Sequence, residues 1–402
     1  MSNLSGKILL MKLKLAFHIL FGCISLLIIN PKFTSSLEAE ESLKVELNKE
    51  IKKGNFLIGL KQYLGGENDS FSRKKNINFI TDKGFLNLIS SNGIKHKSNE
   101  INISWVEIPI KNPKTIERVV FGPFASYESA KKQADKLKDK GFETTVAYPK
   151  NWEVWIPFED DLPEFGLKNK ISRKIKNSQI TPVLRSEYSL MKLEGPIYIY
   201  SEEEIKINGV NFGKNFYLIK DLYGTWTLVQ KIEFDDYLAG VLPYEIGPNS
   251  PLEALKAQAV IARTWGIFNS DRFNMDQYHL CISTQCQVYK PSEISNKNVQ
   301  KAIEATSNLI LTYENQPINA FYHGSNGGIS ATAGESWQIQ DYSYFNSMID
   351  GSKSLNKIFK LPITNESYLN NFLDLIKNSF MGVIILFFDG IRKFLVLKLK
   401  KS

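Results

Sequence analysis

A single carboxylate, Glu245, lies in the proline- and glycine-rich segment VLPYEIGPNS, which precedes a run of small residues ending at Trp265. The residues on either side of Glu245 are aromatic or apolar. If they shield the carboxyl group from water, the charged form is disfavoured and the pKa rises. A carboxyl group of raised pKa is a usable general acid for cleavage of a glycosidic bond. The alternatives are a surface glutamate, or one that accepts hydrogen bonds from amides at a helix end, which would lower its pKa.

A helix is expected to begin directly after this loop. Ser250 and Glu253 have the spacing of a capping box, and Pro251 occupies the first helical position, where its missing N–H costs nothing. One face of the helix then consists mostly of small side chains at helical spacing, namely Leu255, Ala259, Ala262 and Gly266. Such a face allows another element to approach closely.

A second stretch with chemistry-bearing side chains is FYHGSNGGISATAG, in which Ser325 follows His323. The nucleophile elbow of hydrolases requires the pattern G-x-S-x-G, whereas the sequence around Ser325 reads H-G-S-N-G. A serine nucleophile is therefore not expected. The paired glycines Gly327 and Gly328 are expected to permit a tight turn or a close approach of the backbone to a substrate.

The segments YLAGVLPYEIGPNSPLEALKAQAVIARTW, CQVY and FYHGSNGGISATAGESW together resemble the SpoIID family, the sporulation stage II protein D group that includes the LytB-type amidase enhancers. The resemblance extends over roughly residues 234–350. Characterised members are lytic transglycosylases, which cleave glycan strands stripped of stem peptides and form a 1,6-anhydro-muramic end without using water. The catalytic acid of the family occupies a P-x-E position, so the resemblance implies Glu245 as the acid.

One carboxylate is sufficient for such a reaction. Most glycosidases use two, but a transglycosylase can recruit the 6-hydroxyl of the sugar as nucleophile, so that one residue first protonates the leaving oxygen and later deprotonates that hydroxyl. The stripped glycan carries a lactyl carboxylate on each muramic residue and is a polyanion. The net charge of +8 suits such a partner, with a solvated basic surface as the alternative. Nucleic acid is not expected, because the chain has no nucleic-acid-binding motif.

The resemblance also implies substrate contacts. Lys256 and Arg263 match family positions on the helix and could pair with lactyl carboxylates, and Gln258 could bind an N-acetyl group. The segment with the paired glycines adds the groove-lining candidates Tyr322, His323 and Ser325. The alternatives are a solvated helix face, or a structural bond from Arg263 to a loop.

Some family members bind zinc near the segment that corresponds to YHLCISTQCQVY, often with histidine directly before the second cysteine, where this chain has Gln285. With His279 as substitute, His279, Cys281 and Cys286 would supply three ligands of a structural zinc ion. A disulfide between the two cysteines and free thiols are the alternatives. No cofactor is expected for the chemistry itself.

Upstream of this domain, Arg118–Phe124 has the composition of a strand. Ser126 can cap a helix that ends at Gly141, and Phe142–Tyr148 forms a second strand. The stretch VVFGPFASYESAKKQADKLKDKGF resembles one half of a SPOR domain. SPOR domains bind glycan strands that lack stem peptides, so the resemblance implies the same ligand. A generic α+β packing unit is the alternative.

The N-terminus has the pattern of a secretory signal, because lysines precede the apolar run Leu15–Ile29 and small residues follow it. The run is short for a membrane-spanning helix. We therefore expect an exported protein of the periplasm or cell envelope, attached to a membrane only if the N-terminal segment stays uncleaved.

The sequence as a whole predicts an α+β protein. The expected parts are a signal peptide or anchor at 1–36, a tether at 37–53, a β-rich first part of the SpoIID-like domain at 54–100, a SPOR-like unit at 104–158, a linker at 159–190, the SpoIID-like catalytic core at 191–350 and a divergent tail at 351–402. Three functions remain open: an exported lytic transglycosylase acting on stripped glycan, a glycan-binding enhancer of a cell-wall amidase, and a structural envelope protein.

Overall fold

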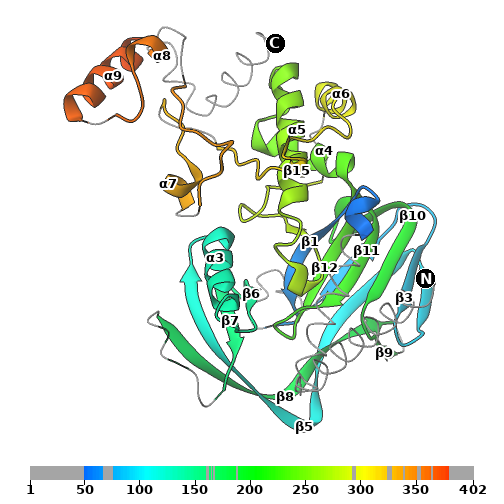
Figure 1. The fold of residues 1–402 in the computed structure, drawn as a ribbon. Coiled ribbons are helices and arrows are strands. Elements are labelled where there is room, and N and C mark those ends of the chain that lie inside the picture. The colour runs from blue at the N-terminus through cyan, green and yellow to red at the C-terminus, as the bar shows by residue number, and fades with distance from the viewer. Residues whose placement is uncertain are drawn as a thin grey trace, which may run out of the picture. The chain divides into compact units, whose positions relative to one another are not determined.

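The protein has an α+β fold (Figure 1). The computed structural model describes residues 49–66, 76–159, 163, 165, 168–186, 189–291, 296–323, 328–337, 340–350, 355–363 and 365–379. The expected signal peptide or anchor, most of the tether and the end of the tail lie outside these residues. Among the helices that are described, none is both long and apolar enough to cross a membrane.

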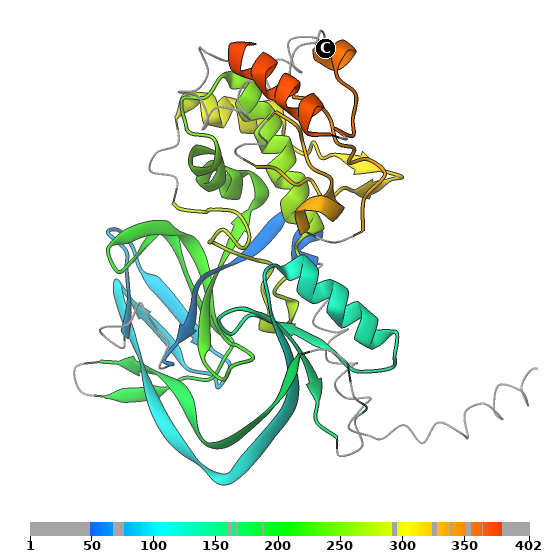
Figure 2. The same ribbon diagram turned by 90° about the vertical axis from the view of Figure 1, so that its left-hand side faces the viewer.

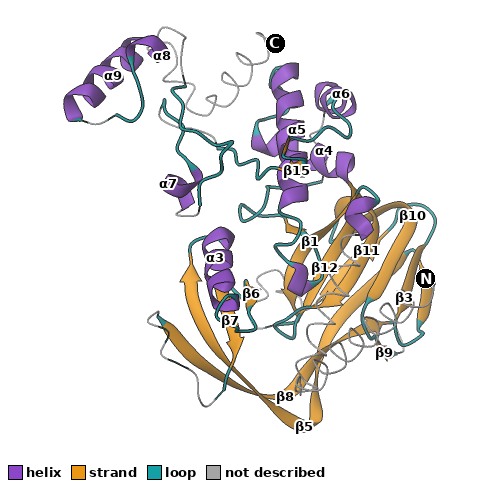
Figure 3. Ribbon diagram, viewed as in Figure 1, coloured by secondary structure: helices purple, strands orange, loops and turns teal. Residues whose placement is uncertain are grey.

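Within the described residues, one sheet of thirteen strands carries most of the fold (Figure 3). Its main path runs in the order β13-β1-β12-β11-β10-β2-β5-β7-β6. Off this path, β3 pairs with β10 and β8 pairs with β5, while β4 pairs with β3 and β9 pairs with β8. The strands of the path are β1 (Asn55–Leu64), β2 (Asn76–Ile80), β5 (Glu100–Phe124), β6 (Thr145–Ala147), β7 (Trp152–Pro157), β10 (Ile197–Ile207), β11 (Val210–Lys220), β12 (Trp226–Glu233) and β13 (Leu280–Cys281). The lateral strands are β3 (Leu86–Ser90), β4 (Lys95–Ser98), β8 (Asn169–Arg185) and β9 (Leu190–Lys192).

Local turn chemistry sets part of this topology. Asn208 and Gly209 both have positive φ, 50° and 88°, and they connect β10 to β11 as a two-residue hairpin. Both residues tolerate this conformation, and such turns match the twist of the flanking strands. The Asn-Gly pair is a sequence signal that favours such a hairpin.

The expected strand–helix–strand unit is present. Helix α3 (Tyr127–Lys138) begins after Ser126, whose hydroxyl accepts a hydrogen bond from the Ser129 amide. Gly141 follows the helix with φ of +89°, a conformation that favours glycine. Strand β7 lies between β5 and β6 and is antiparallel to both, so β5 and β6 run parallel on either side of it. The helix packs its buried Ala130, Ala134 and Leu137 against this part of the sheet.

The segment predicted as a linker differs from expectation, because it contains β8. This strand pairs with β5 in two stretches, and in one of them Lys114 lies opposite Lys176 and Phe121 lies opposite Asn169. The two strands form a long ribbon below the main sheet in Figure 1. Its side chains are mostly polar or exposed, including Ile171 and Ile175. Such a ribbon is held by backbone hydrogen bonds rather than by burial, so the low apolar content that suggested a linker did not reveal it.

Three of the described helices gather at the end of the sheet opposite the β5–β8 ribbon, as the turned view in Figure 2 shows. They are α4 (Phe234–Glu245), α5 (Leu252–Phe268) and α6 (Lys297–Ala305). A short ladder, β14 (Thr312–Tyr313) with β15 (Gln316–Pro317), follows. Helix α7 (Ala333–Trp337) lies before the tail that begins at residue 351, and α8 (Leu355–Ile358) and α9 (Glu366–Ser379) lie within it. Ile349, Phe359 and Phe372 form a small separate core.

Candidate active site

Glu245 is the last residue of helix α4, not part of a loop as its proline- and glycine-rich surroundings suggested. Burial of Tyr237, Leu238 and Val241 holds the helix against the core although Pro243 removes one of its backbone donors. Gly247 then takes a φ of +83° and turns the chain away. The side chain of Glu245 thus lies at a helix C-terminus, where the backbone offers acceptors and no free amides.

The predicted capping box of α5 is wrong. The N-cap residue is Pro251, and no side chain caps this end of the helix. The Ser250 hydroxyl instead donates to the carbonyl of Ile246, the residue that follows the last residue of α4. Glu253 pairs with Lys256 at 2.8 Å.

The small-residue face of α5 does allow a close approach, as expected. A Cβ placed on Gly266 would lie 2.8 Å from the ring of Phe56 on β1, closer than packed carbon atoms come. Ala259 and Ala262 on the same face are fully buried. The glycine therefore sets the distance between α5 and the sheet.

A second glycine brings a chain segment to Glu245. On α4, a Cβ at Gly240 would lie 2.4 Å from the carbonyl oxygen of Lys290, and the Gly240 carbonyl accepts a hydrogen bond from the Lys290 amide at 3.1 Å. The segment that follows Cys286 consequently runs directly along α4. Within it, the amide of Val288 donates to Oε1 of Glu245 at 3.0 Å.

The carboxyl group of Glu245 has two hydrogen-bond donors, the Val288 amide and the Tyr322 hydroxyl. Burial raises its pKa above the ordinary value, and the two hydrogen bonds oppose this effect without cancelling it. The side chain is half-buried, so it keeps some access to solvent. The alternative in which amide bonds lower the pKa is therefore wrong in its net sign.

A chain of buried hydrogen bonds continues from Tyr322. The amide nitrogen Nε2 of Gln287 donates to the Tyr322 hydroxyl at 3.0 Å, and Oε1 of Gln287 accepts from the Tyr237 hydroxyl at 3.2 Å. Gln287 and Tyr237 are both essentially inaccessible to solvent. The proximity of Glu245 also raises the pKa of both tyrosines, whose largest shift comes from burial, and both therefore stay neutral at physiological pH.

The model of the stage II sporulation protein family, SpoIID, matches residues 223–313. Over this segment the chain is similar to the SpoIID family. The SpoIID segment contains α4, Glu245, α5 and the stretch around Val288, whereas Tyr322 and the strand–helix–strand unit lie outside it.

Known relatives match over similar lengths. An uncharacterised protein of Brachyspira hyodysenteriae is 30% identical over 141 residues, which are 34% of this chain and 37% of that protein. The amidase enhancer of Bacillus subtilis is 40% identical over 100 residues, 25% of this chain and 13% of that protein. Stage II sporulation protein D of Bacillus subtilis is 32% identical over 124 residues, 27% of this chain and 36% of that protein. The matches thus cover between 13% and 37% of the relatives' own lengths.

The three polar residues predicted on α5 have different environments in the SpoIID segment. Arg263 is 1% exposed, donates to the carbonyls of Thr306 and Leu309, and forms an ion pair with Asp235 at 2.8 Å. Its interpretation as a substrate contact is therefore corrected to the structural bond to a loop that was the alternative. Lys256 lies partly exposed beside Glu253 and stays a candidate contact.

Gln258 is fully buried, and neither of its amide atoms has a hydrogen-bond partner among the described residues. In this structure it lies away from solvent and could meet an N-acetyl group only after a rearrangement. Of the candidates in the later segment, Tyr322 contacts Glu245, His323 is exposed, and Ser325 lies outside the described residues.

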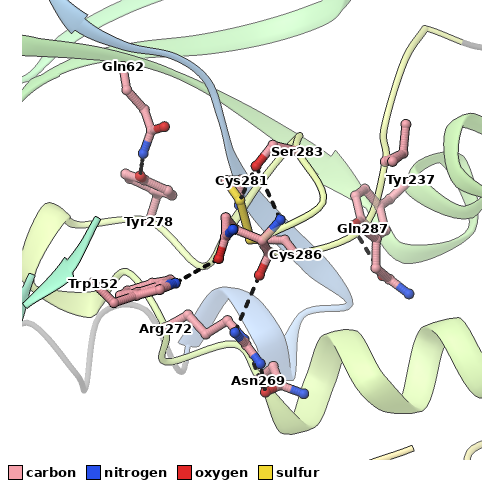
Figure 4. The surroundings of a disulfide bond; sticks show 12 residues. Gln62, Trp152, Tyr237, Asn269, Arg272, Tyr278, Cys281, Ser283, Cys286 and Gln287 are labelled. Atoms are coloured by element: carbon pink, nitrogen blue, oxygen red, sulfur yellow. Dashed lines mark hydrogen bonds between the residues drawn. A yellow bond between two sulfur atoms is a disulfide. The ribbon is translucent and has the colours of Figure 1, made fainter. Parts of the chain in front are cut away.

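Cys281 and Cys286 form a disulfide, with their Cα atoms 5.6 Å apart (Figure 4). Nδ1 of His279 accepts a hydrogen bond from the Leu57 amide at 2.9 Å, and the ring packs against Phe56. With both sulfurs joined to each other and this nitrogen occupied, the three residues do not fit the predicted zinc site. No group of metal-binding side chains occurs elsewhere among the described residues.

The disulfide loop also contacts the strand–helix–strand unit. The indole nitrogen of Trp152 on β7 donates to the side chain of Gln285 at 2.7 Å (Figure 4). Arg272 donates to the Gln285 carbonyl and forms an ion pair with Glu128 of α3. One short loop therefore touches that unit at Gln285 and the candidate acid at Val288.

Sequence reasoning identified Glu245 and Tyr322 but missed Tyr237, Gln287 and Val288. The hydrogen bonds among these residues, Glu245 and Tyr322 connect positions 35 to 50 residues apart. The donor of Val288 is its backbone amide, so the residue type gives no sign of its role. The segment CQVY is one of those that resemble the family, so the sequence indicated that it matters but not what it does.

Proposed function

We propose that the protein is an exported cell-wall enzyme, a lytic transglycosylase that cleaves glycan strands stripped of stem peptides. The observation that carries the proposal is the environment of Glu245: a half-buried carboxyl group, of raised pKa, with two fixed donors. Burial raises the pKa and so favours the protonated form, and the donors stabilise the carboxylate after the proton has left. The similarity of residues 223–313 to the SpoIID family supports the same role for the position.

In the proposed reaction, protonated Glu245 gives its proton to the glycosidic oxygen as the bond from that oxygen to C1 of the muramic residue breaks. The 6-hydroxyl of the same sugar bonds to C1, and the Glu245 carboxylate takes up the hydroxyl proton. The products are a free hydroxyl on the leaving sugar and a 1,6-anhydro ring. The carboxyl group ends in its starting state, so the cycle needs no water and no second carboxylate.

The proposal predicts that purified protein converts stripped glycan into fragments with anhydro ends, detected by mass spectrometry. Glu245→Gln keeps the shape of the side chain but cannot transfer a proton, so its product yield should fall at least about a hundredfold. Glu253→Gln is the matched control, because Glu253 is an exposed glutamate at the start of α5. Anhydro products from Glu245→Gln at the wild-type rate would refute the role of Glu245.

A second candidate function is a glycan-binding enhancer of a cell-wall amidase. It is favoured by the similarity to a protein named amidase enhancer, the highest identity among the three relatives described above. It predicts no anhydro products from the protein alone, and a higher rate when the protein is added to a cell-wall amidase.

A further inference from the structure

The amide of Gln287 has only one orientation that satisfies its neighbours. Its Nε2 lies 3.4 Å from the carbonyl oxygen of Ala262 and 3.0 Å from the Tyr322 hydroxyl. A carbonyl oxygen only accepts hydrogen bonds, so the atom facing Ala262 must be the NH2 group and not the amide oxygen. Flipping the amide would place two acceptors against each other in a site without water contact.

This orientation determines the direction of the next hydrogen bond. Because the Gln287 nitrogen donates to the Tyr322 oxygen, the hydroxyl proton of Tyr322 must point elsewhere. The partner on its other side is the carboxyl group of Glu245. At the far end, the Tyr237 hydroxyl donates to Oε1 of Gln287 and completes the chain.

We propose that Gln287 is a positioning residue, which orients the Tyr322 hydroxyl so that it donates to Glu245. The inference rests on the proposed function and deepens it, because it says what keeps the Tyr322 hydroxyl hydrogen-bonded to the Glu245 carboxylate after proton transfer. Without Gln287, the hydroxyl is free to rotate and to accept a hydrogen bond from another donor. Glu245 would then keep only the Val288 amide as a fixed donor.

The titratable side chains that face Glu245 are Tyr237 and Tyr322, and burial raises the pKa of both well above 10. Neither becomes charged near neutral pH, so a titration there reports on Glu245 itself. A hydrogen bond to a charged group stabilises the charged form. Loss of the Tyr322 bond is therefore expected to raise the pKa of Glu245 by about one to two pH units.

The test measures this titration directly by NMR on protein labelled with 13C in the glutamate carboxyl groups, with Glu245→Gln to assign the signal. Gln287→Met keeps a side chain of similar length without its hydrogen bonds, and Tyr322→Phe removes the hydroxyl. Each variant should raise the titration midpoint of Glu245, and the double variant should raise it no further, because both remove the same bond.

Gln230→Met is the matched control. Gln230 is also a buried glutamine, bonded to Tyr289 and to the Phe212 carbonyl rather than to Tyr322. The control should leave the midpoint unchanged. A wild-type midpoint in Gln287→Met, or an equal rise in Gln230→Met, would overturn the proposal. Should Gln287→Met fail to fold, Tyr237→Phe releases one of the two side-chain partners of Gln287 and should raise the midpoint less.

Kinetics separates this proposal from the proposed function. If the protein turns over glycan, the alkaline limb of kcat/KM should move to higher pH in Gln287→Met by the amount seen in the NMR titration. If no anhydro products form, the proposed function fails, and the pattern of NMR midpoints still decides the role of Gln287.

Discussion

Glu245 experiences two opposing effects, and their balance is what makes it a suitable acid. Burial at the end of α4 disfavours the charged form of the carboxyl group, whereas hydrogen bonds from the Val288 amide and the Tyr322 hydroxyl favour it. With burial alone, the carboxylate formed in a reaction would be left without partners. With hydrogen bonds alone, the proton would be lost before neutral pH. The net rise in pKa, with both donors in place, suits a group that must both give and take a proton.

The two basic residues Arg263 and Lys256 on α5 are expected to contribute very differently to stability. Arg263 bonds two loop carbonyls and Asp235 in the interior, so Arg263→Met should lower the free energy of unfolding by about 2–4 kcal/mol. Lys256 forms only a partly exposed ion pair with Glu253, so Lys256→Met should change the free energy of unfolding by less than about 0.5 kcal/mol. Urea unfolding of both variants measures the difference. Equal stability of the two proteins would contradict the structural role of Arg263.

At the scale of elements, the position of Glu245 depends on how closely α4 and the segment after the disulfide can approach. Gly240 permits the contact with Lys290, and the disulfide holds the start of the same segment. The Val288 amide is thereby presented to the end of α4 from a part of the chain 43 residues away. Gly266 sets the corresponding distance between α5 and β1.

Gly240→Ala tests this contact, with Gly266→Ala for comparison. In an exposed helix the change would stabilise by up to about 1 kcal/mol. At Gly240 the new methyl group would meet a backbone oxygen at 2.4 Å, which cannot move without shifting the segment, and we expect a loss of about 1–3 kcal/mol. At Gly266 it would meet the edge of one side-chain ring at 2.8 Å, so the loss should be smaller. Thermal unfolding ranks the two variants, and the reverse order would contradict the interpretation.

The elements that could be predicted from the sequence are those whose signals are local. The Asn208–Gly209 hairpin and the Ser126 cap depend on residues within a few positions of each other. Ser250 has the same kind of local signal, yet its hydroxyl donates to the carbonyl of Ile246 at the end of α4, which competes with the amides of α5. The amide of Val288 was not predictable at all, since its partner is set by tertiary packing.

At the scale of the whole molecule, the strand–helix–strand unit and the SpoIID segment share buried polar contacts as well as apolar ones. The Tyr148 amide donates to the Tyr223 hydroxyl, which in turn donates to Asp276. The Leu222 amide donates to the other oxygen of Asp276 at 3.1 Å. Burial, assisted by the nearby charge of Asp221, raises the pKa of Asp276 to about 7. The described contact between the two parts therefore contains a carboxyl group that titrates near neutral pH.

This carboxyl group makes stability depend on pH in a definite direction. In the unfolded chain an aspartate loses its proton near pH 4, whereas folded Asp276 keeps it to about pH 7. The folded state therefore binds more protons between these values, and its stability falls as pH rises through this window and levels off above it. Asp276→Asn keeps an uncharged group of the same shape, so it should match wild type near pH 4.5 and exceed it at pH 8. The pKa difference of about three units is worth about 4 kcal/mol at about 1.4 kcal/mol per unit, so the melting temperature at pH 8 should rise by several degrees. Asp135→Asn, at a half-exposed position on α3, is the control and should follow the wild-type profile. An Asp276→Asn protein that loses stability with pH as steeply as wild type would show that another group is responsible.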